Sequence, residues 1–146
     1  MPMDAHMREA TEADLPAILG LYRQLGEDDG RVLDLAAAQK IFARICACPE
    51  YRLHVALTGE RVVGVYGLMI MDNLGHMGTP SAIVEDVVVA EDQRGQGLGG
   101  LMMAHAATLA RKRGCYKIML SSNRARESAH RFYEGLGFVR HGHSFR

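Results

Sequence analysis

One short stretch of this chain restricts its fold more than any other. An apolar, β-branched run at 85–89 leads through a polar link into a turn at 95–100 that holds four glycines in six residues. Glycines let backbone N–H groups converge without obstruction by Cβ atoms. An amphipathic segment follows at 98–113, and the first turn of a helix carries unpaired N–H donors and the positive end of the helix dipole. The stretch therefore predicts a strand, turn and helix that bind a phosphate anion, although a turn that binds nothing is the simpler alternative.

Three phosphate-binding motifs compete for this turn. A Walker loop would place Lys and then Ser or Thr after the last glycine, whereas two apolar residues follow it here. The dinucleotide fingerprint Gly-x-Gly-x-x-Gly is present, but the next strand ends at 120–123 without the acidic residue that would hold a ribose. The third pattern is Arg-x-x-Gly-x-Gly, formed by Arg94, Gly97 and Gly99. Its place between an apolar strand and an amphipathic helix favours this third motif.

This third motif resembles the GNAT superfamily of N-acetyltransferases, which holds the pyrophosphate of acetyl-CoA on such a turn. A second signature carries the same resemblance, because Phe132-Tyr133 followed by Gly137-Phe138 is similar to the superfamily's Phe-Tyr-x-x-x-Gly-Phe. The resemblance covers nearly the whole chain and is strongest over 83–138. It implies a transferase, more narrowly an acyltransferase, that uses acetyl-CoA as its cosubstrate and acetylates an amine.

The resemblance also implies which residues bind acetyl-CoA and which one acts on it. Tyr133 is the residue that points at the CoA sulfur in the superfamily, and it is the candidate acid that protonates the departing thiolate. The acetyl and pantetheine groups are expected on the strand backbone, the pyrophosphate on the turn, and the CoA arm on a polar side chain before the last helix. The expected acetyl-CoA-binding residues are Val87, Val88, Val89, Arg94, Gly95, Gln96, Gly97, Leu98, Gly99, Gly100 and Asn123.

Two acidic residues interrupt the apolar strand, and an acid there is costly unless it is paired or functional. Either Glu85 or Asp86 could accept the amine proton or orient the ammonium group. We assign the catalytic role to Glu85 and the substrate-binding role to Asp86. Neighbouring residues on a strand point to opposite faces, so we expect at most one of the two to face a given cleft directly.

The other reactive residues give weaker signals. Cys115 lies beyond the amphipathic helix, away from the expected acetyl position, so direct transfer in a ternary complex is favoured over a covalent route through cysteine. Cys46-x-Cys48 has no second pair, and His141-x-His143, which would share one face of a last strand, lacks further ligands. We therefore expect no metal.

Within the superfamily, two groups of enzymes share further motifs with this chain. The segments 85–89 and 114–118 look like those of glucosamine-6-phosphate N-acetyltransferases, whereas 120–123 and 129–133 look more like those of aminoalkylphosphonate N-acetyltransferases. Both act on small primary amines that carry a phosphorus anion, so the substrate is expected to be such an amine, with a phosphate or phosphonate as a hypothesis. The basic residues that could balance this anion are Lys117, Arg124 and Arg140. Two other functions remain open: a protein or peptide N-acetyltransferase, and an acetyl-CoA-binding sensor without turnover.

Length and composition are those of one soluble domain. The chain has 146 residues, 48% of them hydrophobic, and its formal net charge is zero, which gives no overall attraction to nucleic acid. No apolar run reaches the length of a membrane span, and three cysteines form no even disulfide framework. We expect a single domain, residues 1–146, in the cytoplasm, without nucleic-acid or membrane partners. Such folds often pair, which makes a homodimer a further hypothesis.

Periodicity indicates where the remaining elements lie. Apolar residues at helical spacing predict four helices, the first capped by Thr11 or Asp14 and the others at 35–47, 97–113 and 126–136. Alternating or continuous apolar runs predict strands around 7–9 and at 51–57, 61–71, 82–89, 117–120 and 138–145. The result is an α+β (mixed α/β) fold with a mixed sheet of six to seven strands and helices on both faces. The acidic loop at 26–30 is either ordinary solvated surface or a segment that attracts a cationic amine.

Overall fold

The computed structural model describes residues 4–122, 124 and 126–146. Its centre is a five-stranded sheet in which the strands follow one another in chain order. The first four strands are antiparallel to their neighbours, and the fifth is parallel to the fourth. The strands are β1 (Ala5–Glu9), β2 (Tyr51–Thr58), β3 (Arg61–Met71), β4 (Ser81–Val89) and β5 (Ile118–Leu120).

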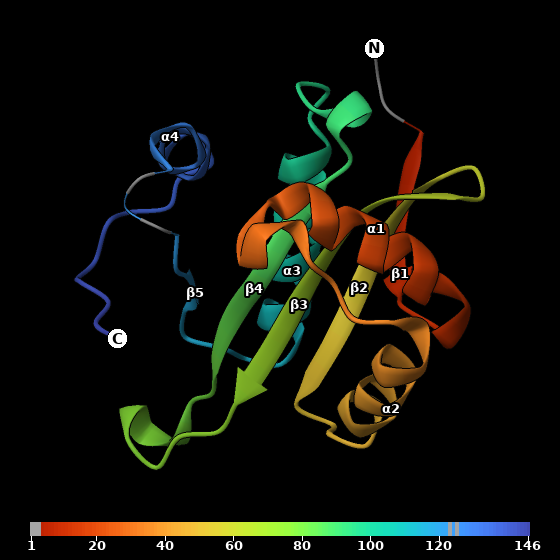
Figure 1. Cartoon of the computed structure of the whole chain (residues 1–146). Coiled ribbons are helices and arrows are strands. Elements are labelled where there is room, and N and C mark those ends of the chain that lie inside the picture. Colours follow the sequence, from red (N-terminus) through yellow and green to blue (C-terminus); the bar gives the residue numbers. More distant parts are fainter. Residues whose placement is uncertain (1–3, 123, 125) are drawn as a thin grey trace.

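Helices cover both faces of the sheet, as the sequence predicted (Figure 1). The main helices are α1 (Leu15–Leu25), α2 (Leu35–Cys46), α3 (Leu98–Lys112) and α4 (Glu127–Gly135). Helices α1 and α2 lie on one face, α3 lies on the other and connects β4 to β5, and α4 lies beyond the β5 edge. Local chemistry sets their ends, since the Asp34 carboxylate accepts the Ala37 N–H at 2.8 Å at the start of α2. Gly114, with φ of 73°, follows the end of α3 as expected.

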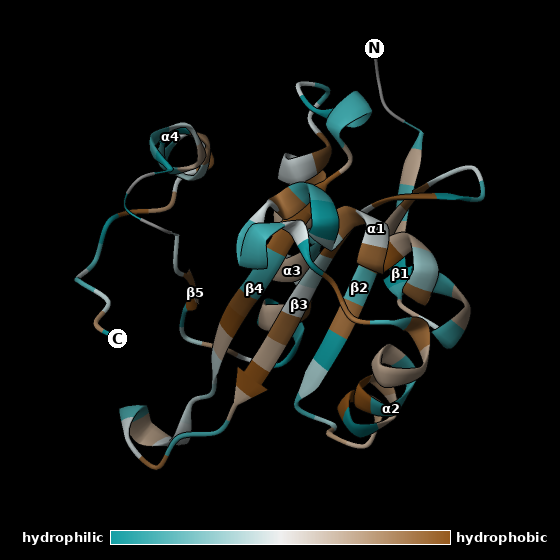
Figure 2. Ribbon diagram, in the orientation of Figure 1, coloured by the Kyte–Doolittle hydropathy of each residue, from teal (hydrophilic) through white to brown (hydrophobic). Residues whose placement is uncertain are grey.

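Apolar side chains from the sheet and three helices form two neighbouring cores. Long brown, hydrophobic stretches run along β3 and β4 (Figure 2). The larger core lies around β3 and β4, where Tyr66, Val65 and Met102 are fully buried. A smaller core joins Leu15, Phe42 and Leu53 where α1 and α2 meet β2. Burying each large apolar side chain contributes about 1.5–3 kcal/mol, so these layers hold the site elements in place.

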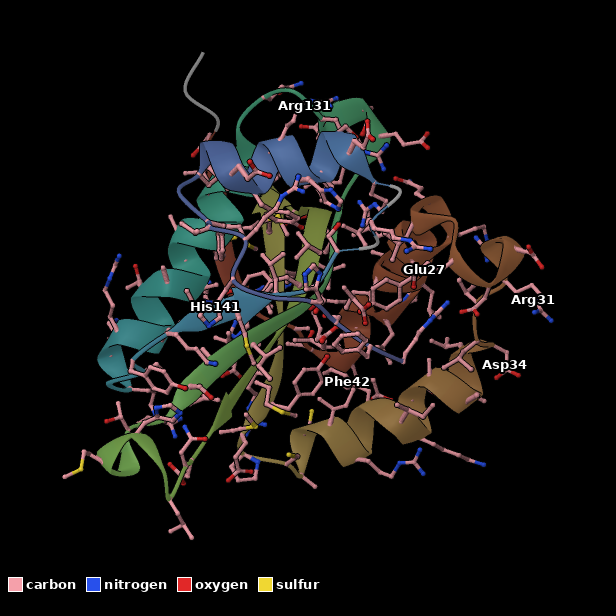
Figure 3. All side chains as sticks on the ribbon, turned by 90° about the vertical axis from the view of Figure 1, so that its left-hand side faces the viewer. Glu27, Arg31, Asp34, Phe42, Arg131 and His141 are labelled. Carbon is pink, nitrogen blue, oxygen red and sulfur yellow. The ribbon has the colours of Figure 1, made fainter. Side chains whose placement is uncertain are left out.

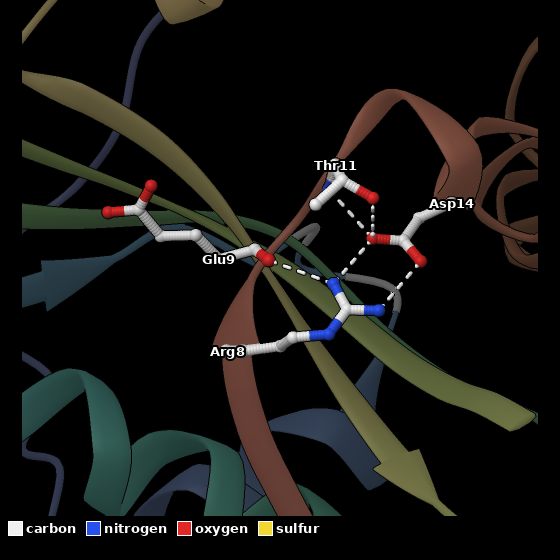
Figure 4. A network of polar contacts seen from close by, with 4 residues as sticks. All are labelled: Arg8, Glu9, Thr11 and Asp14. Atoms are coloured by element: carbon white, nitrogen blue, oxygen red, sulfur yellow. Dashed lines mark hydrogen bonds and ion pairs between the residues drawn. The ribbon is translucent and has the colours of Figure 1, made fainter. Parts of the chain in front are cut away.

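A polar network ties the end of β1 to the start of α1 (Figure 4). The two Arg8 guanidinium nitrogens donate to the two Asp14 oxygens at 2.7 and 2.9 Å. The Thr11 N–H donates to the same carboxylate at 2.7 Å, and Asp14 is only 7% exposed. The hydrogen bond from Arg8 is the main cause that holds the pKa of Asp14 below its usual value, ahead of the opposing effect of burial. The network fixes where α1 begins without touching the glycine-rich turn.

The predicted strand at 138–145 is wrong, and the sheet of the described residues has five strands instead of six or seven. Phe138 closes the turn that follows α4, because its N–H donates to the Tyr133 carbonyl at 3.1 Å. The segment 139–146 then runs exposed along the β5 edge, where Ser144 contacts Ser121 side chain to side chain at 3.2 Å. No backbone ladder forms there, so the shared strand face expected for His141 and His143 does not exist.

Candidate active site

A β-bulge in β4 is the first feature of the candidate site. Glu85 pairs with Gly67 and Val88 pairs with Val65, so Asp86 and Val87 together lie opposite the single residue Tyr66. Asp86 takes the extra position with φ of 49°, in the left-handed region that a non-glycine residue rarely adopts. A bulge of this kind bends the strand and turns its side chains in new directions.

The expectation that at most one of Glu85 and Asp86 faces a given cleft directly rests on strict alternation, and the bulge removes that premise. Strict alternation holds only where every residue is extended, and Asp86 is not. The negative charges of both residues raise the pKa of Tyr51, after the larger effect of burial. Both are exposed. The two acids thus contribute negative charge to the surface near Tyr51.

A third acid reaches this surface from the loop after α1. Glu27 begins the short turn Glu27–Gly30, and its charge raises the pKa of Glu85, behind the larger effects of burial and of Asp86. Figure 3 shows Glu27 on the α1 side of the β5 edge. Burial and the Asp86 charge also raise the pKa of Tyr22, on α1. The acidic loop was noticed in the sequence, whereas Tyr22 and Tyr51 were missed because helical or strand apolar spacing explains both.

Beyond the middle of β4, the strand has lost its neighbour on one side. Pairing between β4 and β5 ends at Val84 and Leu120 among the described residues. On the other side, β4 stays paired with β3 as far as Val89. The backbone of Val87 to Val89 thus presents to the β5 side an edge with no ladder partner in the described part of the chain. Backbone groups at such an edge need another partner, and an extended ligand can provide one.

The glycine-rich turn follows β4 directly. Gly95 and Gly97 have φ of 77° and 85°, which only glycine adopts without strain, and this confirms the turn predicted from the sequence. The first helical bond of α3 runs from the Leu101 N–H to the Gly97 carbonyl at 3.1 Å, so the N–H groups at 98–100 point out of the helix start without an intrahelical partner. The first turn of α3 holds no acidic residue. Its positive dipole end is therefore available to an anion.

Helix α4 lies across this helix start. A Cβ atom on Gly99 would lie 2.7 Å from Cζ of Phe132, and one on Gly100 would lie 3.6 Å from Leu136. Gly99 is thus needed for the close approach of α4, whatever it contributes to a ligand. Tyr133, next to Phe132, is half-buried; burial raises the pKa of its hydroxyl and the Arg126 charge partly opposes this. The turn, the β4 edge and Tyr133 therefore lie in one region.

Other predicted site residues are placed apart from this region or are already paired. Lys117 precedes Ile118, which pairs with Ala82 near the opposite end of β4, and its ammonium lies 5.4 Å from the Tyr116 ring centroid. Arg140 donates to the Glu134 carboxylate at 2.7 Å. Arg124 is exposed, and Asn123 lies outside the described residues.

The described residues hold neither a metal-binding group nor a membrane-spanning helix. Within 4–122, 124 and 126–146, no group of three or more His, Cys, Asp and Glu side chains is arranged to hold a metal ion. No helix in the same residues combines the length and apolar character needed to cross a membrane.

Comparison with known proteins agrees with this geometry. Residues 11–138 match the model of the Acetyltransferase (GNAT) family. A glucosamine 6-phosphate N-acetyltransferase of Trypanosoma brucei brucei is 32% identical over 99% of this chain and 95% of its own. An aminoalkylphosphonate N-acetyltransferase of Salmonella typhimurium is also 32% identical, over 94% of this chain and 86% of its own.

The fold of this chain also matches solved structures of acetyltransferases. The structure of a putative acetyltransferase from Agrobacterium tumefaciens is 35% identical and superposes with a TM-score of 0.90, covering 97% of both chains. The match therefore includes β4, the glycine-rich turn and α4. The α+β fold and the sequence signatures lead to one conclusion: this chain belongs to the acetyltransferase (GNAT) family and is an acyltransferase.

Proposed function

We propose that this protein transfers the acetyl group of acetyl-CoA to the primary amine of a small molecule, by direct transfer in a ternary complex. The observation that carries the proposal is the juxtaposition of the open β4 edge with the glycine-rich helix start. The edge has no ladder partner over Val87 to Val89 among the described residues, and the helix start presents the N–H groups at 98–100. One part suits an extended pantetheine-like arm and the other a diphosphate.

The proposed binding of acetyl-CoA uses main-chain groups more than side chains. The N–H groups at the start of α3 would hold the diphosphate, with Gly95, Gln96 and Gly97 shaping the turn. Arg94 donates from Nε to the Val89 carbonyl at 3.3 Å, so it links the turn to the strand edge. Acetyl-CoA supplies the thioester that the amine attacks. The complete proposed contact set is Val87, Val88, Val89, Arg94, Gly95, Gln96, Gly97, Leu98, Gly99, Gly100 and Asn123.

The amine must lose a proton before it can attack, because an alkyl ammonium titrates near 10.4. We assign this proton to the Glu85 carboxylate, whose pKa is raised by burial and by the charges of Asp86 and Glu27. A raised pKa makes the carboxylate a better base than an ordinary exposed glutamate. Asp86 and Glu27 would hold the ammonium form at the same surface before the proton moves.

The departing sulfur needs a proton, and the Tyr133 hydroxyl is the proposed donor. Half-burial beside the start of α3 keeps the hydroxyl protonated at neutral pH. A covalent route through Cys115 has less support. Its N–H bonds the Ala110 carbonyl at the far end of α3, a helix of 15 residues and thus about 22 Å long. Burial also raises the pKa of the Cys115 thiol, which disfavours the thiolate.

We further propose that the amine substrate carries a phosphate or phosphonate group. The names of two relatives, a glucosamine 6-phosphate and an aminoalkylphosphonate N-acetyltransferase, support an amine that carries a phosphorus anion. Arg124 is the counter-charge that we favour, because Arg140 is engaged by Glu134 and Lys117 lies by the other end of β4. A protein or peptide substrate and a sensor without turnover are the alternatives that the experiment must separate.

A thiol-release assay with acetyl-CoA over a panel of amines tests this function. The panel pairs each phosphorylated amine with its unphosphorylated form and includes a peptide with a free amino terminus. We expect turnover on small amines, a lower KM with the phosphate, and a 10²–10⁴-fold loss of kcat in Tyr133→Phe with acetyl-CoA affinity kept. Acetyl-CoA binding without turnover on any amine would identify a sensor and refute the enzyme.

A further inference from the structure

Three aromatic rings form a polar cluster on the α3 face of the sheet, directly behind the β4 bulge. They come from three different elements: His54 from β2, Tyr66 from β3 and His105 from α3. The Tyr66 hydroxyl lies 2.7 Å from Nδ1 of His105. The His54 ring stacks on Tyr66 with centroids 5.1 Å apart and meets the His105 ring edge-on at 5.3 Å. Tyr66 is fully buried and His54 is 5% exposed.

The cluster lies between the two parts of the proposed acetyl-CoA site, which are the β4 edge and the glycine-rich turn before α3. Tyr66 is the β3 residue opposite Asp86 and Val87. It therefore lies next to the bulge, on the side of β4 away from the free edge. His105 lies on α3 seven residues after Leu98, which places it about 10 Å along the helix from the glycine-rich turn. One hydrogen bond therefore joins β3, the strand paired with the edge strand β4, to α3, the helix that follows the turn.

Both imidazoles are held in their neutral form. Burial lowers the pKa of His54 to about 4, with smaller effects from the nearby His105 and Arg52. Burial and the Lys112 charge lower the pKa of His105. Nδ1 of His54 is buried and has no hydrogen-bond partner in the described part of the chain. Neutral His105 with its proton on Nε2 can accept the Tyr66 hydroxyl at Nδ1, whereas protonated His105 can only donate there, so the bond must reverse and the hydroxyl hydrogen must turn away.

The other charged groups around the cluster do not offset a new positive charge. Arg52 lies on the same strand as His54, and Lys112 lies on the same helix as His105. Glu9 is the acid across the β1–β2 ladder from His54, and it is exposed and already 3.9 Å from the Arg52 guanidinium. A proton taken up by either imidazole would therefore add an ill-compensated charge between α3 and the sheet.

We propose that His54, Tyr66 and His105 are positioning residues that pin α3 to the back of the β4 bulge, and that protonation of the two histidines releases α3 and weakens acetyl-CoA binding. The inference rests on the proposed function, because it takes the glycine-rich turn as the acetyl-CoA site. None of the three side chains needs to touch acetyl-CoA or the amine. They act by setting the distance between the turn and the strand edge.

Steady-state kinetics of Tyr66→Phe is the first test, since this variant keeps the ring and removes only the hydroxyl. At pH 7.5 we expect KM for acetyl-CoA to rise about tenfold, as for one lost hydrogen bond, with kcat at saturation changed less than twofold. Tyr116→Phe removes the hydroxyl of an exposed tyrosine and is the matched control, with no change expected. An unchanged KM in Tyr66→Phe would overturn the pinning role.

The pH dependence is the second test, and it separates the proposal from simple packing. From pH 7.5 to pH 4, where about half of His54 is protonated, we expect KM for acetyl-CoA to rise at least twofold in the native protein. The double variant His54→Phe with His105→Asn keeps a ring and a polar group near the Nδ1 position but cannot titrate, so its KM should stay nearly flat. Circular dichroism at each pH confirms that the proteins are folded. A rise in the double variant equal to that of the native protein contradicts the proposal.

Hydrogen exchange without acetyl-CoA distinguishes failure of this inference from failure of the proposed function. After correction for intrinsic rates, amides of 98–104 should exchange at least threefold faster in Tyr66→Phe than in the native protein or in Tyr116→Phe. If the native protein binds no acetyl-CoA but this difference appears, the function is wrong and the pinning is right. Equal exchange in all three proteins refutes the pinning, whatever acetyl-CoA does.

Discussion

At the scale of single residues, the site depends on one backbone angle. Asp86 in the left-handed region breaks the alternation of β4, and its charge and that of Glu85 both raise the pKa of Tyr51. Glu27 adds a third negative charge from a distant loop. Like charges that approach a carboxylate disfavour its ionisation, so Asp86 and Glu27 raise the pKa of Glu85, after the larger effect of burial. Such a surface attracts an ammonium group and can then accept its proton.

We predict that Glu85→Gln lowers kcat/KM for the amine by about 10²-fold or more at pH 7.5, because amide nitrogen and oxygen cannot accept the ammonium proton. In the native protein, kcat/KM should fall with acidification as Glu85 protonates, at a pH above the usual glutamate value because its pKa is raised. This acid limb should vanish in Glu85→Gln. Initial rates of thiol release from pH 4.5 to 9 provide the measurement.

Two further variants make the Glu85 prediction specific. Glu60→Gln changes an exposed acid in the β2–β3 turn and should leave the profile unaltered. Glu27→Gln removes one charge that raises the pKa of Glu85, so the acid limb should move to lower pH. An acid limb that persists unshifted in Glu85→Gln would assign the base to another group, with Asp86 the first to test.

At the scale of elements, the sequence predicted those whose pattern is local. The hairpin of β2 and β3, the strand–turn–helix of β4 and α3, and the four main helices lie within a few residues of their expected bounds. The strand at 138–145 was wrong because apolar spacing cannot tell whether a sheet edge will accept a partner. The bulge at Asp86 was missed because it depends on the register against β3, which no local pattern encodes.

The candidate site also has parts that the sequence predicts and parts that it does not. The glycine-rich turn could be predicted because glycine at Gly95 and Gly97 is a local backbone requirement. The His54–Tyr66–His105 cluster could not, because its members are distant in sequence and each fits an apolar pattern alone. The spacing of His105 within α3 gives no sign of a polar partner. Only the three-dimensional fold joins it to Tyr66.

The packing of α4 on α3 gives a prediction for whole elements. Gly99→Ala would place a methyl 2.7 Å from the Phe132 ring, so α4 must shift and carry Tyr133 with it. We expect kcat to fall at least tenfold, because a displacement of about 1 Å can cost 10²-fold in rate. Gly100→Ala is the matched comparison; its methyl would lie 3.6 Å from Leu136, an ordinary contact, and its effect should be severalfold smaller. Equal effects of the two variants would show that α4 packing does not position Tyr133.

At the scale of the whole molecule, buried titratable groups make the free energy of unfolding depend on pH. The pKa of His54 is about 4 in the fold and about 6.5 when unfolded, so the unfolded chain binds more protons between these values. The stability that neutral His54 allows is complete above pH 6.5 and is lost as the pH falls toward 4. Asp14, whose pKa is lowered, adds a loss of the same sign below its usual value of 3.8. Glu85, whose pKa is raised, acts in the opposite direction but is exposed.

These signs predict that the free energy of unfolding falls by about 2 kcal/mol between pH 6.5 and pH 5, since each unit of uncompensated titration is worth about 1.4 kcal/mol. Urea unfolding followed by circular dichroism measures it. His54→Phe fills the same space without a titrating group, so the fall should shrink to less than half, whereas His76→Phe, at an exposed position, should retain it. Because His54 lies between the sheet and α3, a pH slope that survives in His54→Phe would mean that other histidines carry the acid sensitivity of the fold.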